Sequence, residues 1–148
     1  MNAAALPLAL AVVAGVLVAI QAPTNAILAK ASGSPVVAAF ISFMVGTVVL
    51  GAMVAGTSGR LLAPELKGVP WYAWIGGIYG AFFVAIAAFA APRVGVGVLL
   101  TAAIAGQLLA AVALDHYGFF GLERQPVNLA RAAGIGLVLI GAVLVRRG

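Results

Sequence analysis

The sequence predicts an all-α integral membrane protein with five transmembrane helices, and the scarcity and placement of its charges support this prediction. Of 148 residues, 65% are hydrophobic and only 7% are charged. Soluble domains carry roughly 45–50% apolar and about 25% charged residues. Eight basic and three acidic side chains cannot cover the surface of a soluble domain of this length. The chain therefore needs lipid around it.

The charged residues divide the chain into five charge-free stretches, and a membrane crossing takes about 20 residues. The first four stretches are long enough, and the fifth becomes so if Arg131 extends its charge to the interface. The stretches are 2–29, 31–59, 68–92, 94–114 and 132–145. We expect one transmembrane domain spanning 1–148, with helices at about 3–22, 34–55, 71–91, 95–114 and 129–146.

Two alternatives, a secretory signal peptide and a transmembrane β-barrel, do not fit the distribution of charged and apolar residues. A secretory signal peptide has a basic segment before its apolar region, whereas no Lys or Arg precedes Leu6 and four further apolar spans follow. A transmembrane barrel needs segments of about 10 residues that alternate apolar and polar side chains. Residues 12–20 and 94–114 are instead continuous apolar runs. A helical bundle is the remaining architecture.

The polar composition argues against an enzyme or a nucleic-acid-binding protein. The chain has no cysteine, one histidine and three acids, too few ligands for a zinc or two-metal site. It has neither a recognisable Ser/His/Asp spacing nor a phosphate-binding glycine loop after a strand. The net charge of +5 is scattered singly over the loops. We expect no catalytic residues, no cofactor, no metal and no nucleic-acid partner.

Small residues recur at four-residue spacing, which lets transmembrane helices pack closely. Packing within the chain is the simpler interpretation of any one of these motifs. The fifth helix is the exception, because Gly134 and Gly141 share a face that we expect to meet a second chain. The other motifs are Ser42/Gly46, Thr47/Gly51, Gly76/Gly80 and Ala102/Gly106/Ala110.

Aromatic residues fall into two groups. Trp71, Tyr72 and Trp74 follow Pro70 and are typical of the interfacial belt. Deeper aromatic residues usually fill volume within a bundle, but in a transporter they can also line an apolar substrate path. The candidates for such a lining are Phe43, Tyr79 and Phe83.

Polar side chains at membrane depth are functional candidates because they are costly there. Gln21 and Asn25 share a helix face, and Pro23 between them removes the N–H that would bond the Ala19 carbonyl. A broken helix with two amides is one way to build a substrate site. A capped helix end at the interface is the alternative.

Two further candidates lie in the fourth helix. Gln107 is surrounded by small and aliphatic residues and needs a hydrogen-bond partner, either on another helix or in a cavity. We favour the cavity, because small neighbours leave room. Asp115 closes the helix next to His116. It either pairs with Arg124 or Arg131, which is the simpler interpretation, or binds a cation or proton.

These residues carry a resemblance that runs along nearly the whole chain. The sequence resembles the short five-helix, YdcZ-type branch of the drug/metabolite transporter superfamily. The segments that carry the resemblance are Gln21–Ala26, Phe43–Thr47, Ala91–Gly95, Gly106–Ala110, Asp115–Gly118, Arg131–Gly134 and Gly141–Leu144.

The resemblance implies an inner-membrane transporter of ten helices, formed as two inverted five-helix halves or as a dimer of a five-helix chain. It is similar in plan to the four-helix small multidrug exporters, whose first helix holds an essential glutamate. This chain has no acid before Glu65, so that cation/proton exchange mechanism does not carry over.

We therefore interpret the chain as a small secondary transporter that moves a small metabolite or drug-like solute through a cavity shared by two antiparallel subunits. A passive dual-topology channel and a non-transporting subunit that stabilises a partner are the alternatives. The basic residues support the antiparallel arrangement, because excess Lys and Arg mark the cytoplasmic side and here they divide four against four. One side has Arg60, Lys67, Arg124 and Arg131, and the other has Lys30, Arg93, Arg146 and Arg147.

Overall fold

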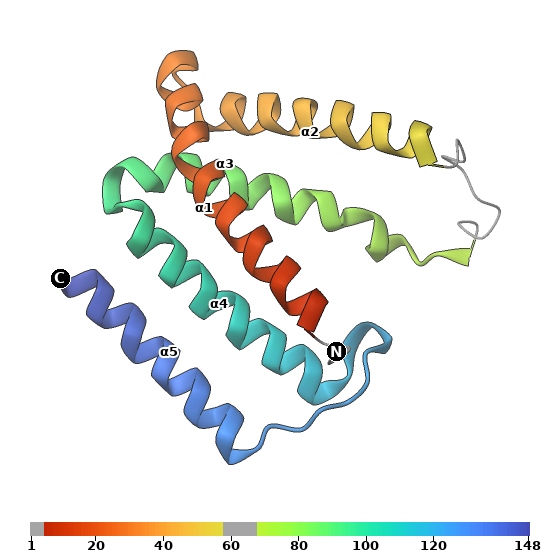
Figure 1. Cartoon of the computed structure of the whole chain (residues 1–148), viewed down its shortest axis with the longest axis vertical. Helices are drawn as coiled ribbons and strands as arrows, with labels where there is room; N and C mark the ends of the chain where they lie inside the picture. The colour runs from red at the N-terminus through yellow and green to blue at the C-terminus, as the bar shows by residue number, and fades with distance from the viewer. Residues whose placement is uncertain (1–4, 58–67) are drawn as a thin grey trace. The chain divides into compact units, whose positions relative to one another are not determined.

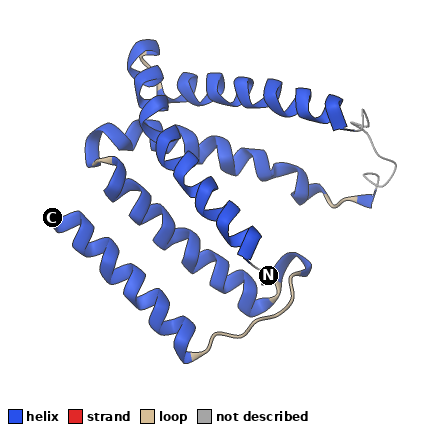
Figure 2. Cartoon of the chain, viewed as in Figure 1, coloured by secondary structure: helices blue, strands red, loops and turns tan. Residues whose placement is uncertain are grey.

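The computed structural model describes residues 5–57 and 68–148, and within these ranges the chain is helix and loop (Figures 1 and 2). Five helices there are long and apolar enough to cross a membrane. Arg60 and Lys67, which enter the charge comparison, lie outside the described residues. The elements are α1 (Ala5–Ser32), α2 (Pro35–Thr57), a 3₁₀ turn η2 (Trp71–Ile75), α3 (Gly76–Val94), α4 (Val96–Tyr117), a 3₁₀ turn η3 (Phe119–Gly121) and α5 (Leu129–Arg147).

The first helix is where the sequence prediction is wrong. We expected it to end near residue 22, but α1 continues through Pro23 to Ser32. In a membrane an unpaired backbone group is costly, so the loss of one hydrogen bond at proline is less damaging than the unwinding of the residues that follow. The hydroxyl of Thr24 also donates to the carbonyls of Ile20 and Gln21, at 3.2 and 2.9 Å. The proposed helix end at residues 21–25 is therefore excluded.

A short turn joins α1 to α2. Gly33 adopts a positive φ of 73°, a conformation that glycine reaches without strain. Ser34 then accepts a hydrogen bond from the N–H of Val37 through its hydroxyl, at 3.4 Å. Pro35 occupies the first helical position, where its missing N–H costs nothing. The turn brings α1 and α2 into contact.

The third span begins and ends differently from the expected helix 71–91. Its first five residues form η2, and α3 continues through Pro92 to Val94. The guanidinium of Arg93 lies 3.6 Å from the centre of the Phe89 ring and donates to the Phe89 carbonyl. Gly95, with φ of 83°, then separates α3 from α4. The link that we expected around Pro92 is thus a single glycine.

The chain divides into two compact units, residues up to Arg93 and residues from Val94. In the first unit the buried side chains are small. Ala29 of α1, Ala38 of α2 and Ala88 of α3 form its core cluster, and Ala38 has no exposed surface. Alanine permits helix backbones to approach closely, which drives association in lipid.

The second unit is a helical hairpin. Helices α4 and α5 lie side by side, and η3 and an extended segment connect them (Figure 1). Gly118, with φ of 66°, ends α4 and donates its N–H to the Leu114 carbonyl. Asn128 caps α5 by accepting the N–H of Arg131 at 2.9 Å. No residue of α5 is buried.

Candidate functional site

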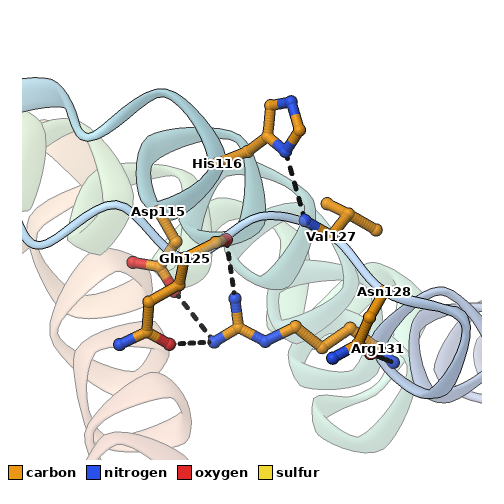
Figure 3. Close-up of polar contacts among 6 residues, drawn as sticks. All are labelled: Asp115, His116, Gln125, Val127, Asn128 and Arg131. Atoms are coloured by element: carbon orange, nitrogen blue, oxygen red, sulfur yellow. Dashed lines mark hydrogen bonds and ion pairs between the residues drawn. The ribbon is translucent and has the colours of Figure 1, made fainter.

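A cluster of polar contacts joins the end of α4 to the start of α5. We call it the α4–α5 clasp, and it comprises Asp115 and His116 of α4, Gln125 and Val127 of the connecting segment, and Arg131 of α5 (Figure 3). All five residues lie in the second unit. Three of its side chains, those of Asp115, Gln125 and Arg131, contact one another directly.

Arg131 is the centre of the clasp. Its Nη2 lies 3.4 Å from Oδ2 of Asp115 and donates to Oε1 of Gln125 at 2.6 Å. Its Nη1 donates to the backbone carbonyl of Gln125 at 3.1 Å (Figure 3). The planar fork of a guanidinium suits several oxygens at once. One side chain on the first turn of α5 therefore ties that helix to both α4 and the connecting segment.

The connecting segment also satisfies the end of α4, whose last carbonyls have no helical partner. The backbone N–H of Gln125 donates to the Asp115 carbonyl at 2.8 Å. Nε of Arg124 donates to the His116 carbonyl at 3.0 Å. Nδ1 of the His116 ring accepts the N–H of Val127 at 3.1 Å (Figure 3).

Asp115 is thus engaged with Arg131, one of the two partners that the sequence suggested. About a third of each side chain remains exposed, 35% for Asp115 and 32% for Arg131. A pair with this exposure is moderately screened by water. The role of Asp115 as a substrate ligand stays a prediction.

The two amides of α1 differ in their surroundings. Asn25 is 3% exposed, whereas Gln21 is half-buried. Asn25 lies on the same stripe as the buried Ala22 and Ala29. Because Lys30 is the first charge along α1, Gln21 is about 13 Å and Asn25 about 8 Å deeper than that charge along the helix axis. Both amides therefore belong to the interior of the span.

Gln107 is exposed midway along α4. Within the described residues its amide makes no hydrogen bond, although other polar side chains of the helix do: the hydroxyl of Thr101 donates to the Gly97 carbonyl at 2.7 Å. Within the second unit Gln107 therefore has no hydrogen-bond partner on a neighbouring helix. The prediction that it faces a cavity remains untested.

An apolar groove of about 400 Å³ lies between α2 and α3. Phe43 lines it, as one of the three predicted aromatic walls, whereas Tyr79 and Phe83 are not among its lining residues. Phe82, another of the deep aromatic residues of the third span, also lines the groove. Phe40 was missed, although Phe40 and Phe43 share a helix face at three-residue spacing. The lining residues are Val36, Ala39, Phe40, Phe43, Ala81, Phe82 and Ala85.

Close packing within the chain explains one of the small-residue motifs. A Cβ added at Gly80 would lie 3.2 Å from Cζ of Phe43. At Gly46, Gly51, Gly76 and Gly106 an added Cβ would meet nothing within 4 Å. Within its own unit each of these four glycines therefore faces open space, and the interpretation that they pack within the chain stays a prediction. The same holds on α5, where Gly134 and Gly141 also have nothing within 4 Å.

Comparison with known protein families shows which family the chain belongs to. The profile of the family described as "Putative inner membrane exporter, YdcZ" matches residues 6–144. The chain belongs to this family. The YdcZ family match covers all five spans and confirms the resemblance drawn from the sequence motifs. No curated protein and no solved structure matches the chain.

Membership in the YdcZ family settles the coarse class. The chain is a multi-pass inner-membrane protein of an exporter family, and exporters are not an enzyme class. Within the described residues no group of three His, Cys, Asp or Glu side chains could hold a metal ion.

Proposed function

We propose that the protein is a small secondary transporter that moves a small metabolite or drug-like solute through a cavity shared by two antiparallel copies of the chain. The family supports a transporter role. The observation that carries the finer proposal is the exposed, unbonded amide of Gln107 in the middle of an otherwise apolar helix. An amide that faces hydrocarbon without a partner costs several kcal/mol, roughly 4–8 in a solvent that cannot hydrogen-bond.

A second copy removes this cost by placing Gln107 against protein or a water-filled cavity. Polar residues in transmembrane helices face such interiors. Among residues 5–57 and 68–148 no large side chain is fully buried, and the buried residues are mostly alanines. Five helices that bury so little have ample surface left for a partner.

Helix α5 is proposed to form part of the contact between the two copies. None of its residues is buried, and Gly134 and Gly141 lie at similar distances on either side of its midpoint. In an antiparallel pair of α5 helices, Gly134 of one copy would therefore face the partner's Gly141. Both positions are open in the single chain, so their smallness serves a neighbour outside it.

The antiparallel arrangement also follows from the charge balance. Five crossings put the two termini on opposite sides, and each side has four basic residues. The positive-inside rule then gives no preferred orientation. Two copies in opposite orientations would form the ten helices that this superfamily plan requires.

The proposed solute contacts are hydrogen bonds from amides and apolar contacts from rings. Gln107, Asn25 and Gln21 would bond the polar part of the solute, and Phe43 would contact its apolar part. The related four-helix exporters bind cations through a glutamate in their first helix, whereas α1 contains no acid. A carboxamide has both a hydrogen-bond acceptor and a donor, so these side chains can bond neutral groups of either kind on the solute.

The test combines ligand binding and transport. A thermal-shift screen of the purified protein against cationic, neutral and anionic metabolites identifies a ligand, because binding stabilises the folded state. Gln107→Leu is expected to retain folding and dimerisation but to lose the ligand shift and counterflow in proteoliposomes. Thr101→Val is the control on the same helix, since that hydroxyl bonds its own backbone. We expect this variant to transport normally.

The outcomes distinguish the alternatives. Saturable uptake with counterflow supports a carrier, whereas flux without saturation or counterflow indicates a channel. Full binding and transport in Gln107→Leu would contradict the cavity position of Gln107. A purified chain with no defined homo-oligomer would indicate a subunit of another complex.

A further inference from the structure

His116 is the one histidine of the chain, and the transport proposal does not use it. Its ring lies at the end of α4, where Nδ1 accepts the backbone N–H of Val127 at 3.1 Å (Figure 3). A nitrogen that accepts a hydrogen bond must carry its lone pair. The imidazole in the clasp is therefore neutral, with its hydrogen on Nε2.

We propose that His116 is a proton-binding site whose protonation frees the short segment around Val127 between α4 and α5. Protonation of Nδ1 converts an acceptor into a donor, so that two N–H groups then point at one another. Neither can bond the other, and the Val127 amide loses its partner. Acid therefore releases the segment before α5 from the end of α4, and a return to higher pH restores it.

Three charged side chains and one aromatic ring lie in or beside the clasp around His116. Arg124 of the connecting segment donates to the His116 carbonyl at 3.0 Å, and Arg131 of α5 lies in the same clasp. The neighbouring carboxylate, Asp115, is engaged with Arg131. The adjacent Tyr117 ring packs edge-on against the imidazole, with ring centres 4.9 Å apart. Among the described residues, none of the hydrogen bonds printed for these three charged side chains goes to the imidazole ring.

The release is local, because the other contacts of the clasp do not involve the ring. Arg131 keeps its bonds to Gln125, and the N–H of Gln125 keeps its bond to the Asp115 carbonyl. The segment that gains freedom lies between Gln125 and the cap of α5 at Asn128. Protonation therefore frees this short segment, while Arg131 still ties the first turn of α5 to Gln125 and Asp115. This inference rests on the geometry of the clasp and does not require the transport proposal.

The test measures the ring and its partner in the same sample. With a single histidine, selectively ¹⁵N-labelled protein in lipid nanodiscs gives one pair of imidazole signals. Spectra are compared at about pH 8 and about pH 5.5. The proposal predicts an unprotonated Nδ1 at the higher pH and two protonated ring nitrogens at the lower pH. The hydrogen-exchange protection of the Val127 amide, corrected for the intrinsic pH dependence of exchange, should fall about tenfold, as expected for one lost hydrogen bond.

Three variants identify the cause. His116→Asn places an oxygen where Nδ1 lies and does not titrate, so protection of Val127 should be high at both pH values. His116→Phe retains a ring without an acceptor, so protection should be low at both. Asp115→Asn removes the neighbouring carboxyl but should retain the pH response. Equal protection of Val127 at both pH values in the unmodified chain, or an unchanged pH response in His116→Asn, would overturn the proposal.

Discussion

The two units of the chain are held together by different means. In the first unit, α1, α2 and α3 meet through alanines such as Ala38 and Ala88, which are almost completely buried. In the second unit, α5 buries no residue and is tied to α4 through Arg131 and its polar partners. The comparison shows two ways to associate helices in lipid, steric fit of small residues and hydrogen bonds at a helix end.

The difference follows from the lack of a hydrophobic driving force between helices in a membrane. A helix pair must therefore gain either close van der Waals contact or polar bonds. The first unit uses the former along its helices, and its core has no room for larger side chains. The second unit uses the latter at one end and leaves the rest of α5 available to a neighbour.

The largest effect is expected from Ala38→Leu, which overfills the core of the first unit. Ala38 has no exposed surface, so the larger side chain must displace helices. We expect a loss of about 3 kcal/mol in the free energy of unfolding, measured by thermal or denaturant unfolding in detergent. Ala133→Leu on the exposed face of α5 is the control and should leave the monomer unchanged. Equal stability of the two variants would show that the alanine core does not hold the first unit.

A smaller loss is expected from Arg131→Leu, which removes the centre of the clasp. The variant loses the contacts with Asp115 and Gln125 and leaves the carboxylate unpaired. Because both charges are about a third exposed, we expect a loss of about 1–2 kcal/mol. Arg146→Leu near the end of α5 is the matched control, and unfolding in detergent is again the measurement. If both arginine variants unfold alike, the clasp does not stabilise the hairpin.

The smallest effect is expected from a pair of glycine variants in α3. Replacing a helical glycine with alanine gains roughly 0.5–1 kcal/mol of backbone entropy. Gly77→Ala meets nothing within 4 Å and should show that gain, whereas Gly80→Ala places a methyl group 3.2 Å from the Phe43 ring. We expect Gly80→Ala to be less stabilising by about 0.5 kcal/mol, because the ring must shift. Identical unfolding curves for the two variants would show that the groove wall yields freely.

The sequence predicts the helices well because charge-free runs of sufficient length must cross the membrane as helices. It fails at the end of α1, since rules for soluble helices make Pro23 a stop, whereas lipid favours a continuous helix. The C-terminal end of α4 was predictable from Gly118, and the start of α5 was predictable from Arg131. Two of the five predicted C-terminal helix ends, those of α1 and α3, therefore lie further along the chain, because each helix continues through a proline.

The candidate site was less predictable. The pairing of Asp115 with Arg131 was one of two alternatives, because spacing along the chain does not fix the path of the segment between them. The bond from Val127 to His116 has no signal in the sequence, since a backbone N–H can find its acceptor anywhere. The groove between α2 and α3 also depends on how two helices cross, which four-residue patterns do not specify.

The central claim, a cavity shared by two antiparallel copies, is tested most directly by cross-linking introduced cysteines. The chain has no native cysteine, so each introduced thiol is unique. Leu129→Cys and Val145→Cys lie at opposite ends of α5, about 24 Å apart along its axis. Antiparallel α5 helices bring Cys at one position near Cys at the other, so co-expressed variants should cross-link in the membrane while each variant alone does not. Efficient cross-linking of either variant to itself, or none in the mixture, would contradict the antiparallel α5 contact.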